Sequence, residues 1–255
     1  MKATHFLLLA LIALPIAELS ARTPVENILA KAREYLGGEE HLNEIQSIRF
    51  EGAFVQENSM GTFTTILRKP MFYRSEFDDG EATAITGYDG VSGWHRVTHN
   101  EDPGEDFLRA LNPRENRRLR LNIHDNLFMY TELERVRGEI RYVERTFKDG
   151  FPAHRLAFYY DGELVFHRYF DAEDGALIAT TNPDGITVRE YGSRIVNGVR
   201  FPRRVVATLQ GEEVSILEYD RIVINEEHAE EIFEFPVMPL TRPRLEEVMP
   251  AEVEP

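Results

Sequence analysis

Two places in the sequence bring together residue types that could carry out a reaction or hold a metal. Ser92 lies within Gly90-Val91-Ser92-Gly93-Trp94, which departs at its last position from the Gly-x-Ser-x-Gly turn of serine hydrolases. His228 has four carboxylates nearby, those of Glu226, Glu227, Glu230 and Glu231. No second histidine stands at the spacing that a metal site uses. We therefore interpret Ser92 as part of a turn before a strand, and His228 as part of a solvated acidic segment.

Other reaction classes are excluded by what the sequence lacks. There is no cysteine, so disulfides, thiol nucleophiles and thiolate metal sites are ruled out. The sequence has no glycine-rich phosphate-binding loop. Its 44 acidic residues are so many that a pair of carboxylates carries no information about glycoside hydrolysis. We predict a protein without catalytic residues, metal or cofactor.

Five arginines cluster in this acidic chain, at Arg109, Arg114, Arg117, Arg118 and Arg120. One hypothesis is that some of them bind an anionic head group at the mouth of a cavity, because guanidinium pairs well with phosphate or carboxylate. The alternative is a solvated helix face balanced by Glu115 and nearby acids, as most charge runs are.

The formal net charge of −15 limits the partners. Nucleic-acid binding needs clustered lysine and arginine, and an anionic membrane surface repels an acidic protein. We therefore predict no nucleic-acid partner and no adsorption to such a membrane. A high net charge favours solubility, which suits a diffusing monomer.

The first residues resemble a secretory signal peptide. Lys2 provides a positive charge, residues 6–17 are apolar apart from Pro15, and small Ala21 precedes Arg22. The apolar run is too short to span a bilayer as a helix. We expect cleavage after Ala21, no acyl anchor and a periplasmic location; a retained N-terminal anchor is the alternative.

The rest of the chain predicts one helix followed by many strands. Thr23 and Glu26 can form a capping box, apolar residues at helical spacing continue to Leu36, and Gly37 ends the helix. From Ile48 the apolar period changes to two, which predicts strands. Turn signals of the Asx-Gly or Gln-Gly type then recur at residues 149–150, 161–162, 174–175, 184–185, 197–198 and 210–211.

Residues 105–136 interrupt the strand series. Their apolar residues have roughly helical spacing, and Pro113 breaks the run, so we predict two short helices or a helix and a loop. The predicted fold is therefore mainly β with a helical lid. It is a large curled antiparallel sheet, or unclosed β-barrel, of about ten or eleven strands, with an N-terminal helix and a helical insertion. We expect one domain over residues 22–240 and a disordered tail, rich in proline and glutamate, over 241–255.

The helices either fill the concave face of such a sheet or leave a cavity for a ligand. Each aromatic residue of the strands is then either core or cavity wall, and the period alone does not tell which strand face is concave. The candidates for the cavity wall are Phe50, Phe54, Phe63, Tyr73, Phe77, Trp94, Phe158, Tyr160 and Phe166.

Several segments, in order, resemble those of the outer-membrane lipoprotein carrier superfamily (LolA/LolB-like). They are YLGG at 35–38, KPMFYR at 69–74, YDGVSGW at 88–94, YFDAEDG at 169–175, GVRFP at 198–202 and IFEFP at 232–236. The resemblance covers about residues 24–238. It is closest to the members labelled as lipoprotein-sorting proteins.

The resemblance implies an unclosed β-barrel whose helical lid covers an apolar cavity that shields acyl chains from water, without catalysis. It implies a lipoprotein or lipid ligand and delivery partners at the inner or outer membrane. The family's lid-fastening arginine is replaced by Lys69, which lacks the planar fork of arginine. The candidates for the lid or head-group site are Lys69, Arg74, Arg117 and Arg118. The alternative function is a non-transporting envelope sensor or protein-interaction module on the same fold.

Overall fold

The computed structural model describes residues 23–56, 59–101, 104 and 106–236. The expected signal peptide, its cleavage after Ala21 and the expected tail over 241–255 lie outside this range. None of the helices within it combines the length and the apolar character that a bilayer crossing requires.

The N-terminal half supplies six consecutive strands. They are β1 (Ser47–Gln56), β2 (Ser59–Arg68), β3 (Phe72–Asp78), β4 (Ala82–Asp89), β5 (Gly93–His99) and β6 (Phe107–Ala110). The C-terminal half supplies β7 (Gly138–Lys148), β8 (Phe151–Tyr160), β9 (Glu163–Asp171), β10 (Leu177–Thr181), β11 (Ile186–Tyr191), β12 (Arg194–Val196), β13 (Val199–Phe201), β14 (Arg204–Leu209) and β15 (Glu212–Ile224).

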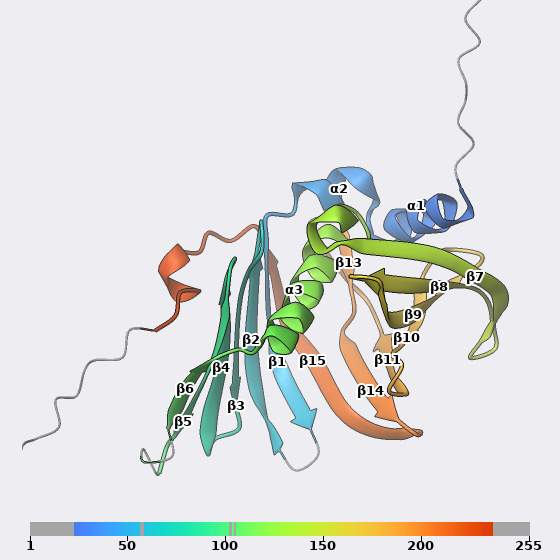
Figure 1. Cartoon of the computed structure of the whole chain (residues 1–255). Coiled ribbons are helices and arrows are strands. Elements are labelled where there is room, and N and C mark those ends of the chain that lie inside the picture. Colours follow the sequence, from blue (N-terminus) through green and yellow to red (C-terminus); the bar gives the residue numbers. More distant parts are fainter. Residues whose placement is uncertain (1–22, 57–58, 102–103, 105, 237–255) are drawn as a thin grey trace, which may run out of the picture.

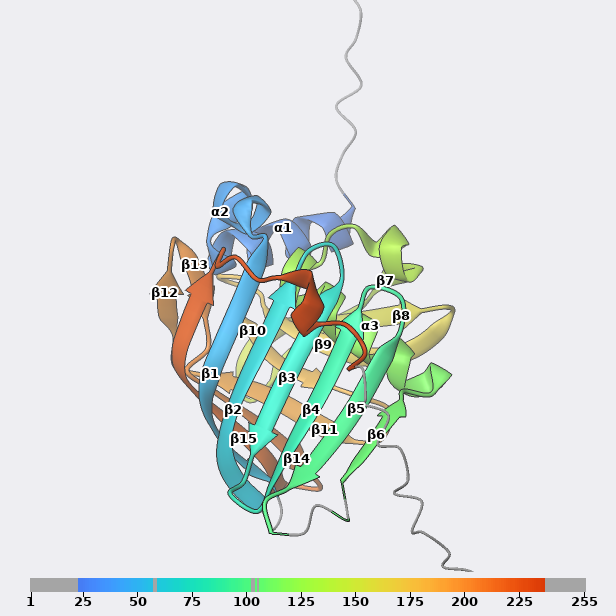
Figure 2. The same ribbon diagram turned by 90° about the vertical axis from the view of Figure 1, so that its left-hand side faces the viewer.

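Thirteen of these strands form one curved antiparallel sheet, in the order β6-β5-β4-β3-β2-β1-β15-β14-β11-β10-β9-β8-β7 (Figures 1 and 2). The pairing of β1 with β15 joins the two halves, and β12 pairs only with β13 in a separate hairpin. The edge strands β6 and β7 do not pair with each other, so the barrel is not closed. The predicted fold class is confirmed, with thirteen strands in place of about ten or eleven.

The tight turns follow the sequence signals. Asp149 and Gly150 both have positive φ, of 52° and 88°, and Asn197 and Gly198 have values of 47° and 80°. Such two-residue turns match the twist of the strands that they join. The positions of these hairpins are therefore set locally, by glycine and its neighbour.

Two helices lie across one end of the sheet. They are α1 (Pro24–Leu36) and α2 (Gly38–Glu44) (Figure 1). Thr23 caps α1 in the predicted capping box with Glu26, and Gly37 follows its last turn with a φ of 143°. A side chain at Gly37 would collide with the carbonyl oxygen of Gly198 in the β12–β13 hairpin, so this glycine also permits close packing.

The insertion differs from the prediction. Residues 107–110, expected in a helix, form edge strand β6, which pairs with β5. Pro113 does not interrupt a helix but begins one, α3 (Pro113–Phe128), because a proline at the first helical position loses no hydrogen bond. Asn112 caps this helix: its Oδ1 accepts a hydrogen bond from the Glu115 N–H at 3.0 Å. A short 3-10 helix, η2 (Leu133–Val136), follows.

Helix α3 lies inside the curve of the sheet (Figure 1). Its Ile123, Leu127 and Phe128 belong to a core cluster with β1 and β2, and its Leu121 belongs to a second cluster with β8 and β9. The outer face carries a different element, the 3-10 helix η3 (Glu230–Ile232), which lies over the strands of the N-terminal half (Figure 2). One helix therefore bridges both halves of the concave face.

We expect Asn112→Ala to lower the free energy of unfolding by about 1 kcal/mol, because the first turn of α3 loses its capping acceptor. Asn112→Ser keeps a capping oxygen and should unfold nearly as the natural protein does in a urea titration. Equal destabilisation by both substitutions would contradict the capping role.

Candidate ligand-binding site

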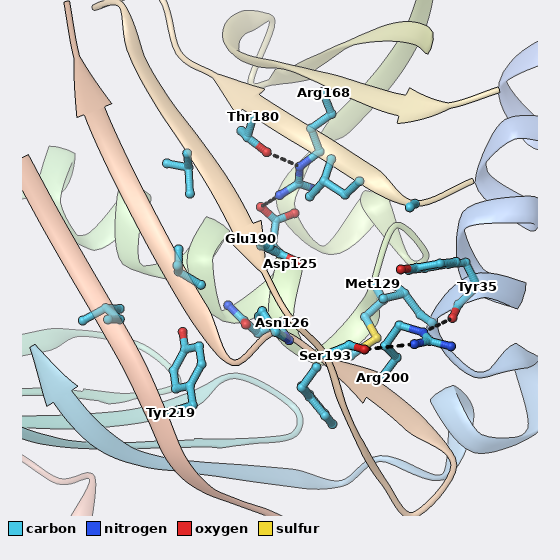
Figure 3. A pocket seen from close by; sticks show the side chains of 18 of the residues that line it. Tyr35, Asp125, Asn126, Met129, Arg168, Thr180, Glu190, Ser193, Arg200 and Tyr219 are labelled. Atoms are coloured by element: carbon cyan, nitrogen blue, oxygen red, sulfur yellow. Dashed lines mark hydrogen bonds and ion pairs between the residues drawn. The ribbon is translucent and has the colours of Figure 1, made fainter. Parts of the chain in front are cut away.

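Helix α3 leaves a cavity of about 420 Å³ beneath it, which we call the main cavity. Its walls come from the end of α1, from α3, from the β12–β13 hairpin, from strands of the C-terminal half and from β1 (Figure 3). The apolar part of its lining includes Leu36, Phe50, Leu177, Val188, Phe201, Val205 and Leu217. The polar part includes Asp125, Arg168, Glu190, Arg200 and Tyr219.

A second hollow of about 400 Å³, the side cavity, lies against strands β1 to β5. Phe54, Tyr73 and Phe77 line it, together with small residues of β4 such as Ala84. The three aromatic residues belong to or pack against the core cluster that includes α3, so this hollow lies on the same concave face.

A row of aromatic rings runs between the two cavities. Phe77 stacks on Phe63 at 5.6 Å between ring centroids, Phe63 meets Tyr219 at 5.7 Å, and Tyr219 meets Phe50 at 5.0 Å. Phe77 lines the side cavity, whereas Tyr219 and Phe50 line the main cavity. A continuous row of aromatic side chains therefore connects the two open volumes on the concave face. Together these volumes are of the size of a small-molecule site.

A buried ion pair ties α3 to the sheet. Arg168 on β9 donates from Nη2 to Asp125 Oδ2 at 3.0 Å, and the two side chains are only 11% and 15% exposed. Tyr160 on β8 donates from its hydroxyl to Asp125 Oδ1 at 3.1 Å. Asp125 therefore holds two strands at once from a single position on the helix (Figure 3).

The surroundings of this pair favour its charged form. Burial opposes the charge of Arg168, but Asp125 and the neighbouring tyrosines outweigh it, and the pKa of Arg168 is raised. Burial, together with the charge of Asp125, also raises the pKa of Tyr160. The Arg168 guanidinium lies 4.4 Å from the centroid of the Phe166 ring and 4.9 Å from that of Phe158, so aromatic faces add to its stabilisation.

A second fastening lies at the C-terminal end of α3. Buried Arg33 of α1 donates from Nη1 to the carbonyl oxygens of Phe128 at 3.2 Å and Met129 at 2.7 Å. Its other nitrogens bind Glu39 of α2, at 2.5 and 2.6 Å. A cation at the C-terminus of a helix satisfies carbonyls that have no partner within the helix. Arg33 thus joins three helices.

Glu190 on β11 lines the main cavity without a partner. None of the hydrogen bonds and ion pairs of the described segments involves its carboxylate, and its side chain is exposed. Burial within the protein raises its pKa, and the charge of Arg168 opposes this shift only in part. The carboxylate therefore remains partly desolvated and uncompensated.

The predicted wall residues separate into three groups. Phe50 lines the main cavity; Phe54, Tyr73 and Phe77 line the side cavity, and Phe63 lies in the aromatic row between them. Phe158, Tyr160 and Phe166 line neither cavity and pack in the second core cluster around Arg168.

Trp94 lies on the outer face instead of at a cavity. Its indole N–H donates to the Phe233 carbonyl at 2.9 Å, beneath the η3 segment. Arg74 has the same orientation and donates to the Ile232 carbonyl at 3.2 Å. Because successive residues of a strand face opposite sides of the sheet, the choice of face decides such assignments. Both residues therefore hold the C-terminal segment on the outside of the sheet.

The other proposed lid residues lie apart from one another. Lys69 lies 5.3 Å from the Phe128 ring centroid, and burial lowers its pKa, but the hydrogen bonds to the end of α3 come from Arg33. Arg117 binds the Tyr160 carbonyl at 2.6 Å and the carboxylates of the β8–β9 turn. Arg118 is exposed. Within the arginine cluster, Arg109 pairs with Glu115 at 2.8 Å, as in the solvated-face interpretation.

Ser92 and His228, which the sequence analysis considered first for a reaction or a metal site, make contacts within the fold. Ser92 lies in an exposed turn, where its N–H donates to Asp89 Oδ1 at 2.8 Å. His228 is more buried than predicted, at 10% exposure, and burial lowers its pKa. No cluster of three or more metal-ligating side chains occurs among residues 23–56, 59–101, 104 and 106–236.

The polar cavity residues Asp125, Arg168 and Glu190 were missed by sequence reasoning. A signal for two of them existed in the alternation of their strands. Arg168 stands between Phe166 and Phe170 on one face of β9, and Glu190 follows Val188 on one face of β11. A charged residue in an apolar row is costly unless it is paired or functional.

We expect Asp125→Asn to lower the free energy of unfolding by about 3 kcal/mol, because the buried Arg168 loses its counter-charge. Glu144→Gln breaks the more exposed contact with Arg155 on β8 and should have a much smaller effect. Urea unfolding of both variants measures the difference, and similar losses would show that the buried pair does not fasten α3.

We expect Glu190→Gln to stabilise the protein at neutral pH. Folding raises the pKa of the Glu190 carboxyl. The stability of the folded protein therefore falls as the pH rises from the unfolded-state pKa of this group through its folded-state pKa. The gain in unfolding free energy from the substitution should therefore disappear below about pH 4, where both states are protonated. A gain independent of pH would contradict this account.

No family profile matches the sequence, and no curated protein sequence matches it. Solved structures do match its fold. A DUF1329 family protein from Desulfovibrio piger has a TM-score of 0.54 at 10% identity, over 84% of this chain and 98% of that one. A LolA superfamily protein from Nitrosomonas europaea has a TM-score of 0.51 at 12% identity, over the same shares of the two chains. The chain therefore has a LolA-like fold.

Proposed function

We propose that this protein is a periplasmic carrier that binds the acyl chains of a lipoprotein or a lipid on the concave face of its sheet, for transport toward the outer membrane. The observation that carries the proposal is the pair of cavities joined by a row of aromatic rings beneath α3. The likeness to a LolA superfamily protein supports it at the level of the fold. The carrier acts as a monomer and exchanges its cargo with delivery partners at the two membranes.

The binding energy would come from apolar burial. Each methylene of an acyl chain contributes about 0.8 kcal/mol when it leaves water, which corresponds to roughly a fourfold gain in affinity. The walls of the main cavity combine leucine, valine and aromatic side chains with polar groups, so an acyl chain would follow the apolar part of the lining. Release would follow when a partner moves α3 or competes for the cargo.

We expect affinity for fatty acids to rise roughly fourfold per methylene and then to level off once the cavities are filled. Displacement of a fluorescent acyl probe measures this on the mature chain. Val205→Trp places a large side chain in the main cavity and should weaken binding, whereas Met60→Trp, at an exposed position of β2, should not. An affinity independent of chain length would contradict the proposal.

Native mass spectrometry of the protein from its own compartment, followed by organic extraction, identifies the cargo. A stoichiometric amphiphile supports the carrier. A ligand-free protein that also fails to bind acyl probes would favour the other function, a sensor or interaction module whose interior is occupied by its own side chains.

A further inference from the structure

The main cavity holds an acid that no residue of the surrounding walls neutralises. Glu190 projects from β11 into the cavity (Figure 3). Its carboxylate forms no hydrogen bond or ion pair with the described residues. Its neighbours on the same strand face include the apolar Val188 and Val205, so a carboxylate without a partner at this position requires an explanation.

The nearest cation is already engaged. Arg168 donates hydrogen bonds from Nη2 to Asp125 Oδ2 at 3.0 Å and from Nε to Thr180 Oγ1 at 3.4 Å. Its Nη1 is buried and has no hydrogen-bond partner among the described residues. The charges of Arg168 and Asp125 cancel, which leaves Glu190 and Arg200 as the charged lining residues without an ion pair in the described segments. Arg200, on another wall, stacks over Tyr35 and binds the Tyr35 carbonyl at 3.1 Å.

The other lining residues of the main cavity include tyrosine rings and neutral amide and hydroxyl groups. The charge of Glu190 acts on Tyr130 and Tyr219. Burial raises the pKa of Tyr130 to about 12 and also raises that of Tyr219, so both remain neutral phenols at neutral pH. The negative face of an aromatic ring attracts a cation, and so does a carboxylate. A site that has both therefore favours a cation more than either group alone.

We propose that the main cavity receives an amphiphile with a positively charged ammonium group, which pairs with Glu190 beside the rings of Tyr130 and Tyr219. This inference rests on the proposed function and adds the charge of the ligand to it. The alkyl chain of the ligand lies against apolar lining residues such as Phe50 and Leu217, and its ammonium group supplies the counter-charge that Glu190 lacks.

The test compares decylammonium with decanol, which have the same chain and differ in charge, by displacement of a fluorescent acyl probe from the mature protein. We expect the natural protein to bind decylammonium at least about tenfold more tightly, a difference of about 1.4 kcal/mol. Glu190→Gln should abolish this preference and leave the affinity for decanol within about twofold. Glu190→Asp keeps the charge and should keep the preference.

Because the whole chain is acidic, a control must remove the same charge elsewhere. Glu212→Gln, at an exposed position of β15, should leave the preference unchanged. A preference that persists in Glu190→Gln, or equal binding of both amphiphiles by the natural protein, would overturn the inference while the carrier function stands. Failure of the natural protein to bind the acyl probe at all would instead remove the proposed function.

Discussion

The concave face of the thirteen-stranded sheet carries two apolar clusters that must be shielded from water, and the fold depends on how that face is covered. Helix α3 alone spans both halves of the sheet, and the Asp125–Arg168 ion pair fixes its position on the C-terminal half. A helix held only by apolar contacts could slide along the face, because such contacts have little directionality. The ion pair and the Tyr160 hydroxyl define one position, and that position leaves the two cavities open.

The second fastening has a different character. Arg33 contacts backbone carbonyls at the end of α3, so it holds the helix end without any particular side chain there. Its carboxylate partner Glu39 is 62% exposed, which makes this fastening accessible to water. Asp125 and the carbonyls that Arg33 binds lie within about one turn of each other, so both fastenings hold the C-terminal end of α3, one through a side chain in the core and the other through the backbone.

Local sequence signals predicted most of the fold. Capping residues identified the start of α1, and pairs such as Asp149-Gly150 located the hairpins, because both depend on neighbouring residues only. The start of α3 was missed for the opposite reason: Pro113 was interpreted as a break although Asn112 before it is a cap. Strand β6 was missed because four residues are too few to establish a period.

The site was less predictable, since it depends on which strand face is concave and on contacts between distant residues. The alternation of apolar residues predicted strands around both Phe50 and Trp94, but in the structure these two residues lie on opposite faces of the sheet. The pairing of Asp125 with Arg168 joins residues 43 positions apart, and no local pattern marks it.

The open seam between β6 and β7 has a mechanical consequence. In a closed barrel, strand number and stagger fix the diameter, so the interior volume cannot change without breaking backbone hydrogen bonds. Here no ladder joins the two outermost strands. The two halves of the sheet can therefore flex apart about the β1–β15 pairing while every ladder stays intact. The interior volume can therefore change, and a bulkier ligand would be accommodated by a change in the curvature of the sheet instead of by unfolding.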